Sequence, residues 1–207
     1  MCAFYTLDWD VVEDEPLPVA LMNTIRADRD GVHDTLDAGA VDWLRTAADV
    51  LLADVARDGA ERDLDVADGV AGLRRLRDAL RRLAAELTDD PRPEAASAIP
   101  DRDAALRVLN ETCARATATP ALVWAEGASP RAVAHTAHPL VVLALARLAA
   151  EAVNLLARPS ALGACEAPGC VLYFVRDRPR RQWCSAACGN RARVARHYRR
   201  HRSSAEV

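Results

Sequence analysis

Residues 165–191 read CEAPGCVLYFVRDRPRRQWCSAACGNR, and they carry most of the structural information in the chain. Four cysteines stand there in two close pairs with the spacing C-x4-C-x13-C-x3-C: Cys165, Cys170, Cys184 and Cys188. Zinc favours four tetrahedral ligands, and two close pairs separated by a short span can enclose one ion. The segment is too small to bury a useful core, so a metal would supply folding free energy. We therefore predict a structural Zn²⁺ whose coordination shell is closed by four cysteines.

The residues around the cysteines predict a treble-clef-like order of elements. Pro168-Gly169 lets the backbone turn sharply between the first two cysteines. Residues 171–175 are β-prone and residues 181–183 return toward Cys184, which predicts a hairpin. Ser185 is expected to cap a basic helix that begins near the last cysteine pair.

Three other interpretations of the cysteines stay open at this point. Two disulfides are disfavoured, because a reducing compartment keeps paired thiols available for metals. Four unrelated buried thiols would need no metal. A different metal set has the spacing C-x3-C-x8-H-x3-H and consists of Cys184, Cys188, His197 and His201. That set would leave the first cysteine pair without a role.

The composition of the 207 residues indicates two parts with opposite charge. Residues 165–207 contain ten arginines against three acidic residues, a net charge of +7, whereas residues 1–164 carry −10. The basic part is the candidate for a nucleic-acid partner. The sequence has no apolar run of about 20 residues, as a transmembrane helix needs, and no signal-peptide pattern at its start, so we expect a cytoplasmic protein.

The first part of the chain predicts a mostly α fold with short β elements (α+β). Apolar residues recur at helical spacing in four segments: 40–57, 65–87, 101–113 and 139–157. A short strand is expected within residues 1–15, a loop at 26–34, a hairpin at 121–135 and a linker at 158–160. The arginine face of the second helix is interpreted as a solvated surface. The predicted domains are residues 1–158, acidic and mainly helical, and residues 165–202, a small zinc finger.

The helix that follows Cys188 is rich in arginine. At 100° per residue, Arg193, Arg196, Arg200 and His197 share one face. Val194 and Tyr198 are expected to pack on Tyr173 and Phe174 of the hairpin. Arginine forms bidentate bonds with phosphates and guanine edges, so we expect this helix to contact DNA.

The predicted DNA contacts combine the hairpin with the helix, and they are Arg180, Arg181, Asn190, Arg191, Arg193, Arg196, Arg199 and Arg200. Neutralising about six phosphates predicts a slope of about −5 in log K against log[salt].

Asn23, Thr24 and Arg26 follow a short helical segment that begins near Pro16. One interpretation is a pocket for a small-molecule effector in the N-terminal part. The alternative is a helix end at which the Asn and Thr side chains satisfy nearby backbone groups.

Two short motifs connect the chain to a known family. Trp183-Cys184-Ser185 followed by Cys188-Gly189-Asn190-Arg191 resembles the signature of the CGNR zinc-finger family. Residues 21–24 (LMNT) and 41–44 (VDWL) resemble the ABATE domain that precedes the finger in this family. Many members have one more residue between the third and fourth cysteines. The resemblance implies that the four cysteines bind zinc, and that the protein is a bacterial stress-induced transcription regulator that binds DNA through the finger.

We therefore expect a DNA-binding transcription regulator and not an enzyme. The chain has no nucleophile elbow, no phosphate-binding glycine loop and no His-Glu metal motif. A treble-clef nuclease built on Asn190 and His197 would need more acidic residues than this segment contains. The alternative function is a protein-interaction adaptor whose basic finger docks on an acidic partner or on the acidic body.

Overall fold

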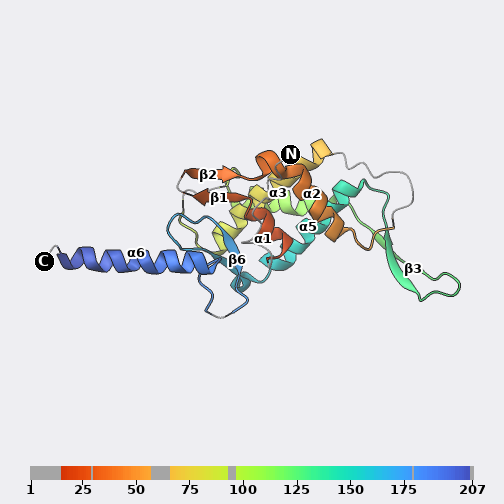
Figure 1. Ribbon diagram of the computed structural model, residues 1–207. Coiled ribbons are helices and arrows are strands. Elements are labelled where there is room, and N and C mark those ends of the chain that lie inside the picture. The colour runs from red at the N-terminus through yellow and green to blue at the C-terminus, as the bar shows by residue number, and fades with distance from the viewer. Residues whose placement is uncertain (1–14, 29, 57–65, 93–96, 179, 206–207) are drawn as a thin grey trace, which may run out of the picture.

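The computed structural model describes residues 15–28, 30–56, 66–92, 97–178 and 180–205 (Figure 1). The strand expected within residues 1–15 lies outside this part, apart from Glu15. Five helices build the body: α1 (Leu17–Met22), α2 (Leu36–Leu51), α3 (Val66–Leu87), α4 (Arg102–Ala114) and α5 (Leu140–Leu156). The sixth helix, α6 (Ala186–Ala205), belongs to the C-terminal segment. The prediction of a mostly helical fold with short β elements is confirmed.

Helices α3 and α5 form the centre of the body. They contact each other, and each also contacts α1, α2 and α4. Their leucine and alanine stripes, such as Leu76 and Leu80 on α3 and Leu148 and Ala152 on α5, are fully buried. The apolar periodicity of the sequence therefore predicts the right helices, because burial of one stripe of each helix against its neighbours drives this packing. Within the described residues, no helix combines the length and apolar character that a membrane span needs.

Three antiparallel pairs of strands complete the structure. They are β1 (Ile25–Asp28) with β2 (Gly31–Asp34), β3 (Thr119–Val123) with β4 (Arg131–His135), and β5 (Leu162–Ala164) with β6 (Tyr173–Val175). The loop expected at 26–34 is wrong, because this segment forms the β1–β2 hairpin. Gly31 has a φ of +125° at its turn, a conformation that glycine adopts without steric cost.

The hairpin expected within the finger has a different partner strand. Strand β6 pairs with β5, which precedes the first cysteine, whereas residues 181–183 form a loop. The segment between the first two cysteines therefore lies within the connection of the β5–β6 pair. The expected linker contains a 3₁₀ turn, η2 (Pro159–Ala161), which leads into β5 without a break.

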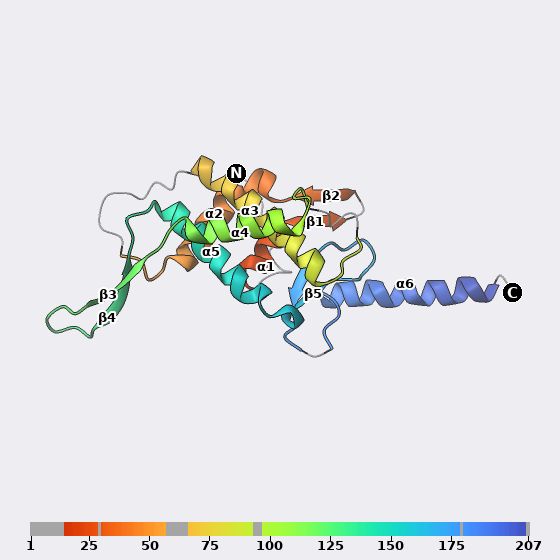
Figure 2. The same ribbon diagram turned by 180° about the vertical axis from the view of Figure 1, so that it is seen from behind.

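Two elements project from opposite ends of the body (Figures 1 and 2). One is the β3–β4 hairpin, and the other is α6, which extends away from the body as a single helix. Val194 and Tyr198 on α6 are 54% and 70% exposed, so their expected packing on the hairpin is wrong. Tyr173 and Phe174 are unavailable to them, because Tyr173 is buried in the core of the body and Phe174 is buried beside the cysteines.

The arginine face of α3 is only partly solvated, which corrects the sequence interpretation. Arg77 and Arg81 are 5% and 1% exposed. Arg77 forms an ion pair with Asp34 at 2.7 Å. Arg81 donates a hydrogen bond to the backbone oxygen of Met22 at 2.8 Å, at the end of α1. These two arginines are therefore structural, because their partners lie inside the protein.

Candidate metal centre and nucleic-acid interface

The four predicted cysteines meet in one cluster, and their sulfur atoms all lie within 4.8 Å of one another. The Cys170–Cys184 and Cys184–Cys188 sulfur distances are 3.8 and 3.5 Å. A tetrahedron with Zn–S bonds of about 2.3 Å has edges of about 3.8 Å, so these four thiols fit a zinc ion. Four sulfurs leave no open coordination position, which makes this a structural zinc site.

The arrangement of the sulfur atoms also bears on the alternative interpretations of the cysteines, namely disulfides and a mixed Cys–His metal site. All four cysteines are free thiols, and the Cys184–Cys188 and Cys170–Cys184 sulfur distances of 3.5 and 3.8 Å are far longer than an S–S bond of about 2.05 Å. The cluster unites Cys165 and Cys170 with the second pair, so the first pair has a role at the same site. The side chain of His201 lies outside the described part. His197 itself is exposed on α6.

The thiols perturb one another strongly. Hydrogen bonds from Cys170 and Cys184 lower the pKa of Cys165 to about 2. The hydrogen bond to Cys165 raises the pKa of Cys170 to about 12, and the pKa of Cys184 is raised as well. The protein alone therefore favours the thiolate at Cys165 and the neutral thiol at Cys170 and Cys184. A dication would favour the deprotonated form of the others, so zinc binding should release protons.

Local backbone structure brings the sulfurs together. Residues 165–170, which hold the first two cysteines, form a tight turn that we call the knuckle. Here the Cys165 N–H donates to the oxygen of Leu172 at 3.0 Å, which continues the β5–β6 pairing toward the metal site. At the start of α6, the Cys188 N–H donates to Ser185 Oγ at 3.2 Å, which confirms Ser185 as the helix cap. The last cysteine is thus fixed on the first turn of α6.

Each residue of the Cys-Gly-Asn-Arg segment has an identifiable contact. Gly189 lies under the Trp183 ring, and a Cβ at this position would approach the ring to 3.2 Å. Asn190 accepts a hydrogen bond from Arg193 at 2.5 Å. Arg191 donates from Nη2 to Cys188 Sγ at 3.2 Å. A guanidinium beside a sulfur ligand offsets the negative charge of the metal site, which is a supporting role outside the coordination shell.

Arg92 ties the body to the knuckle. Its Nη1 donates to the backbone oxygens of Cys165 and Cys170 at 2.8 and 2.7 Å, so one side chain holds two of the metal ligands. The same guanidinium binds both carboxylate oxygens of Asp90, at 2.6 and 2.5 Å. The Asp90 side chain is only 1% exposed. Burial alone would raise the pKa of Asp90, but hydrogen bonds from Arg92 and Tyr173 outweigh it and lower that pKa.

Asn23 and Tyr173 join α1 to strand β6. The Asn23 amide donates to the Tyr173 oxygen and accepts from the Tyr173 N–H, both at 2.9 Å. The Tyr173 hydroxyl donates to Asp90 at 2.8 Å. Asn23 therefore pairs with the β6 backbone like a neighbouring strand, and it connects the body to the finger across 150 positions of sequence.

The residues predicted to line an effector pocket make structural contacts at the end of α1 and on β1. Asn23 and Thr24 are both 3% exposed, and Thr24 donates to the oxygen of Leu21 at 2.8 Å. Thr24 thus satisfies a nearby backbone group, as the alternative interpretation expected, whereas Asn23 binds the backbone of Tyr173, which is distant in sequence. Arg26 lies on β1 opposite His33, away from these contacts.

The predicted DNA-binding residues divide into two groups. Arg181 is bound within the finger, since it donates to Glu15 at 2.7 Å and to the oxygen of Cys184 at 2.9 Å. Arg191 serves the Cys188 sulfur, as described above. Five others are exposed around the start of α6 and along its length: Arg180, Asn190, Arg193, Arg196 and Arg199. The side chain of Arg200 lies outside the part that the structure describes.

Sequence reasoning missed the residues that join the finger to the body. Asp90 and Arg92 flank Pro91 in a segment that reads only as a helix breaker. Glu15 accepts from the Val175 N–H at 2.8 Å and pairs with Arg181. Only the close acid–proline–arginine spacing was a local signal, because all other partners lie far apart in the sequence.

Two family models match the chain. Residues 161–201 match the CGNR zinc finger. Residues 15–159 match the ABATE family, which is described as "Putative stress-induced transcription regulator", and this description names no catalytic activity. No curated protein matches the chain significantly. Since the second match covers more than half of the sequence, the chain belongs to the ABATE family of transcription regulators and carries a CGNR zinc finger at its C-terminal side.

Proposed function

We propose that this regulator binds duplex DNA through α6, which the zinc-bound finger holds at its base. The observation that carries the proposal is that α6 extends away from the body. Twenty residues extend from the metal site, about 30 Å at 1.5 Å per residue, and the helix leaves the body as a single rod (Figure 1). A major groove about 12 Å wide admits one α-helix of this kind.

The charge of α6 supports the same proposal. Arg193, Arg196 and Arg199 follow one another at intervals of three and are exposed. Like charges at this spacing repel each other and weaken an isolated helix. A polyanion along the helix would turn this repulsion into attraction, and arginine suits both phosphates and guanine edges. We further propose a treble-clef-like finger over residues 165–202, in which the knuckle, β6 and α6 surround the zinc, and a body over residues 1–158.

Salt dependence tests this function directly. Four exposed arginines among the predicted contacts, Arg180, Arg193, Arg196 and Arg199, predict a slope of about −4 in log K against log[salt]. Binding of a labelled duplex to the zinc-loaded chain should follow this slope between about 50 and 200 mM salt. Replacing Arg196 and Arg199 by Gln should reduce the slope by about 2. Arg131→Gln, on the β3–β4 hairpin, is the charge-matched control and should change nothing. A flat salt response would refute the proposal.

A second candidate function is docking on an acidic protein. Val194 and Tyr198 lie four residues apart and are 54% and 70% exposed, so α6 carries an apolar strip next to its arginines. Helix-in-groove recognition uses such a strip. Genome-wide binding of the intact chain beside a Cys184→Ser variant separates the two functions. A DNA regulator should show enriched sites that the variant loses, whereas an adaptor should show none with either chain.

A further inference from the structure

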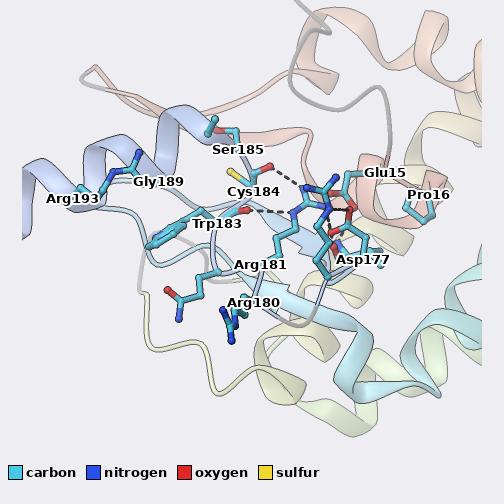
Figure 3. A pocket seen from close by; sticks show the side chains of 14 residues that line it. Glu15, Pro16, Asp177, Arg180, Arg181, Trp183, Cys184, Ser185, Gly189 and Arg193 are labelled. Carbon is cyan, nitrogen blue, oxygen red and sulfur yellow. Dashed lines mark hydrogen bonds and ion pairs between the residues drawn. The ribbon is translucent and has the colours of Figure 1, made fainter.

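A groove of about 810 Å³ opens beside the base of α6 (Figure 3). Its walls are Val175, residues 177–178 and 180–185, the first turns of α6 with Gly189 and Arg193, and Glu15 and Pro16 from the body. The volume falls within the range of about 300–1,000 Å³ that small-molecule sites occupy. The groove lies next to the zinc ligands. It shares Arg180 and Arg193 with the residues that we propose for duplex DNA, whereas Arg196 and Arg199 do not line it.

The lining of the groove is cationic. It contains four arginines against Glu15 and Asp177, which is an excess of two positive charges. Arg181 pairs with both acids, at 2.7 Å from Glu15 and 3.4 Å from Asp177, and Arg178 lies 3.7 Å from Asp177. Three exposed arginines stand at the rim: Arg178, Arg180 and Arg193. Since Arg193 donates to Asn190, Arg180 is the one of the three without a partner among the described residues, and it is the first candidate for an external anion.

An aromatic ring shares this groove with the arginines. Trp183 lines it and is partly exposed, while its ring is supported from the helix side by Gly189. Arg181 donates a hydrogen bond from Nε to the Trp183 backbone oxygen at 3.4 Å, which restrains the backbone that carries the ring. Gln182, which is exposed beside it, offers both a donor and an acceptor. An indole next to an exposed arginine provides the two contacts that bind unpaired nucleotides: stacking and phosphate pairing.

We propose that this groove binds a nucleotide whose base stacks on Trp183 and whose phosphate pairs with Arg180. Bases inside a duplex are stacked on each other and cannot reach an indole. The ligand is therefore an unpaired nucleotide, carried by a single-stranded nucleic acid or free in solution. The single-stranded source extends the proposed DNA-binding function and rests on it, whereas a free nucleotide would be a ligand of the finger in its own right.

The test compares three probes on the zinc-loaded full chain: a labelled oligothymidylate of about 15 nucleotides, ATP as a competitor, and a labelled duplex. Trp183→Leu should weaken binding of the oligothymidylate about 5- to 100-fold, from a stacking energy of about 1–3 kcal/mol. Trp183→Phe keeps an aromatic ring and should retain most of the affinity. Arg180→Gln should weaken the same probe without loss of zinc. Arg131→Gln should leave all three probes unchanged.

The outcomes separate this proposal from the proposed function. Competition by ATP identifies a free nucleotide as a ligand, and its absence with intact oligothymidylate binding identifies the polymer. Arg196→Gln should weaken the duplex only. If the duplex does not bind while Trp183-dependent oligothymidylate binding persists, the duplex function fails and the groove stands.

The groove proposal is overturned in two ways. The first is failure of both oligothymidylate and ATP to bind a chain that binds duplex. The second is an unchanged affinity for them in Trp183→Leu at full zinc content. Should Trp183→Leu lose zinc, Arg180→Gln decides, because this exposed residue makes no contact with the cysteines among those described. Unchanged binding by Arg180→Gln then overturns the proposal. Equal displacement of the oligothymidylate by an acidic peptide from wild type and from Trp183→Leu would also overturn the proposal, because binding would then depend on charge and not on the Trp183 ring.

Discussion

Replacing Arg92 by Ala should weaken both the stability of the chain and its affinity for zinc. The change removes two hydrogen bonds to the backbone of metal ligands and leaves the carboxylate of Asp90, 1% exposed, without its cationic partner. Leaving one charge of a buried pair uncompensated costs about 3–5 kcal/mol. Loss of a supporting contact outside the coordination shell lowers metal affinity about 10- to 100-fold. Urea unfolding of the zinc-loaded chain and competition with a chelator would measure the two effects.

Two variants keep this result interpretable. Arg92→Ala combined with Asp90→Asn removes the uncompensated charge and should recover part of the lost stability, about 1–3 kcal/mol. Arg102→Ala removes an arginine whose pair with Asp103 is largely exposed, at 62% and 84%, and should leave zinc affinity unchanged. Unfolding and zinc affinity of Arg92→Ala that match wild type would show that the body and the finger are energetically independent, which contradicts the coupling argued here.

Three further outcomes follow from the metal site and its neighbours. Arg191→Ala should lower zinc affinity about 10- to 100-fold, because Cys188 loses its cationic neighbour; equal chelator competition curves would argue against this role. Burial, with the charge of Asp90 second, raises the pKa of Tyr173. Its stabilising contribution is therefore complete below about pH 10 and decreases above it, by up to about 1.4 kcal/mol per pH unit. Tyr173→Phe should show a flatter urea stability profile between about pH 10 and 12, and parallel profiles would exclude this linkage. Cys184→Ser should lose stoichiometric zinc by elemental analysis, and full retention would remove Cys184 from the ligand set.

The features that sequence predicts well are those whose cause is local. The spacing of Cys165, Cys170, Cys184 and Cys188 identifies the metal site, because two knuckle-like pairs converge on one ion without reference to the rest of the fold. Helices α3, α4 and α5 follow from apolar periodicity and from breakers at their ends. The cap at Ser185 belongs to the same class, since it satisfies backbone groups within three residues.

The features that sequence could not predict depend on distant partners. The choice of β5 over residues 181–183 as the partner of β6 is an example, because either segment is close enough in sequence to pair. The burial of Arg81 is another, since it needs the end of α1 and the oxygen of Val171, 90 positions away. Val194 and Tyr198 show the converse: their helical spacing suggests a packed strip, but no element of the described structure covers it.

The contacts of Arg92, Asp90, Tyr173 and Asn23 imply that the body does more than carry a finger. A self-contained finger would need only its metal, since zinc binding supplies about 10–16 kcal/mol in small zinc-finger peptides. Here the body also binds the backbone of two metal ligands and completes the edge of β6. Any change that moves residues 88–92 must therefore alter the knuckle, and loss of the metal must alter the packing around Asp90. Because α6 is anchored by Cys188 at the same centre, the direction in which its arginines point depends on the body and the zinc together.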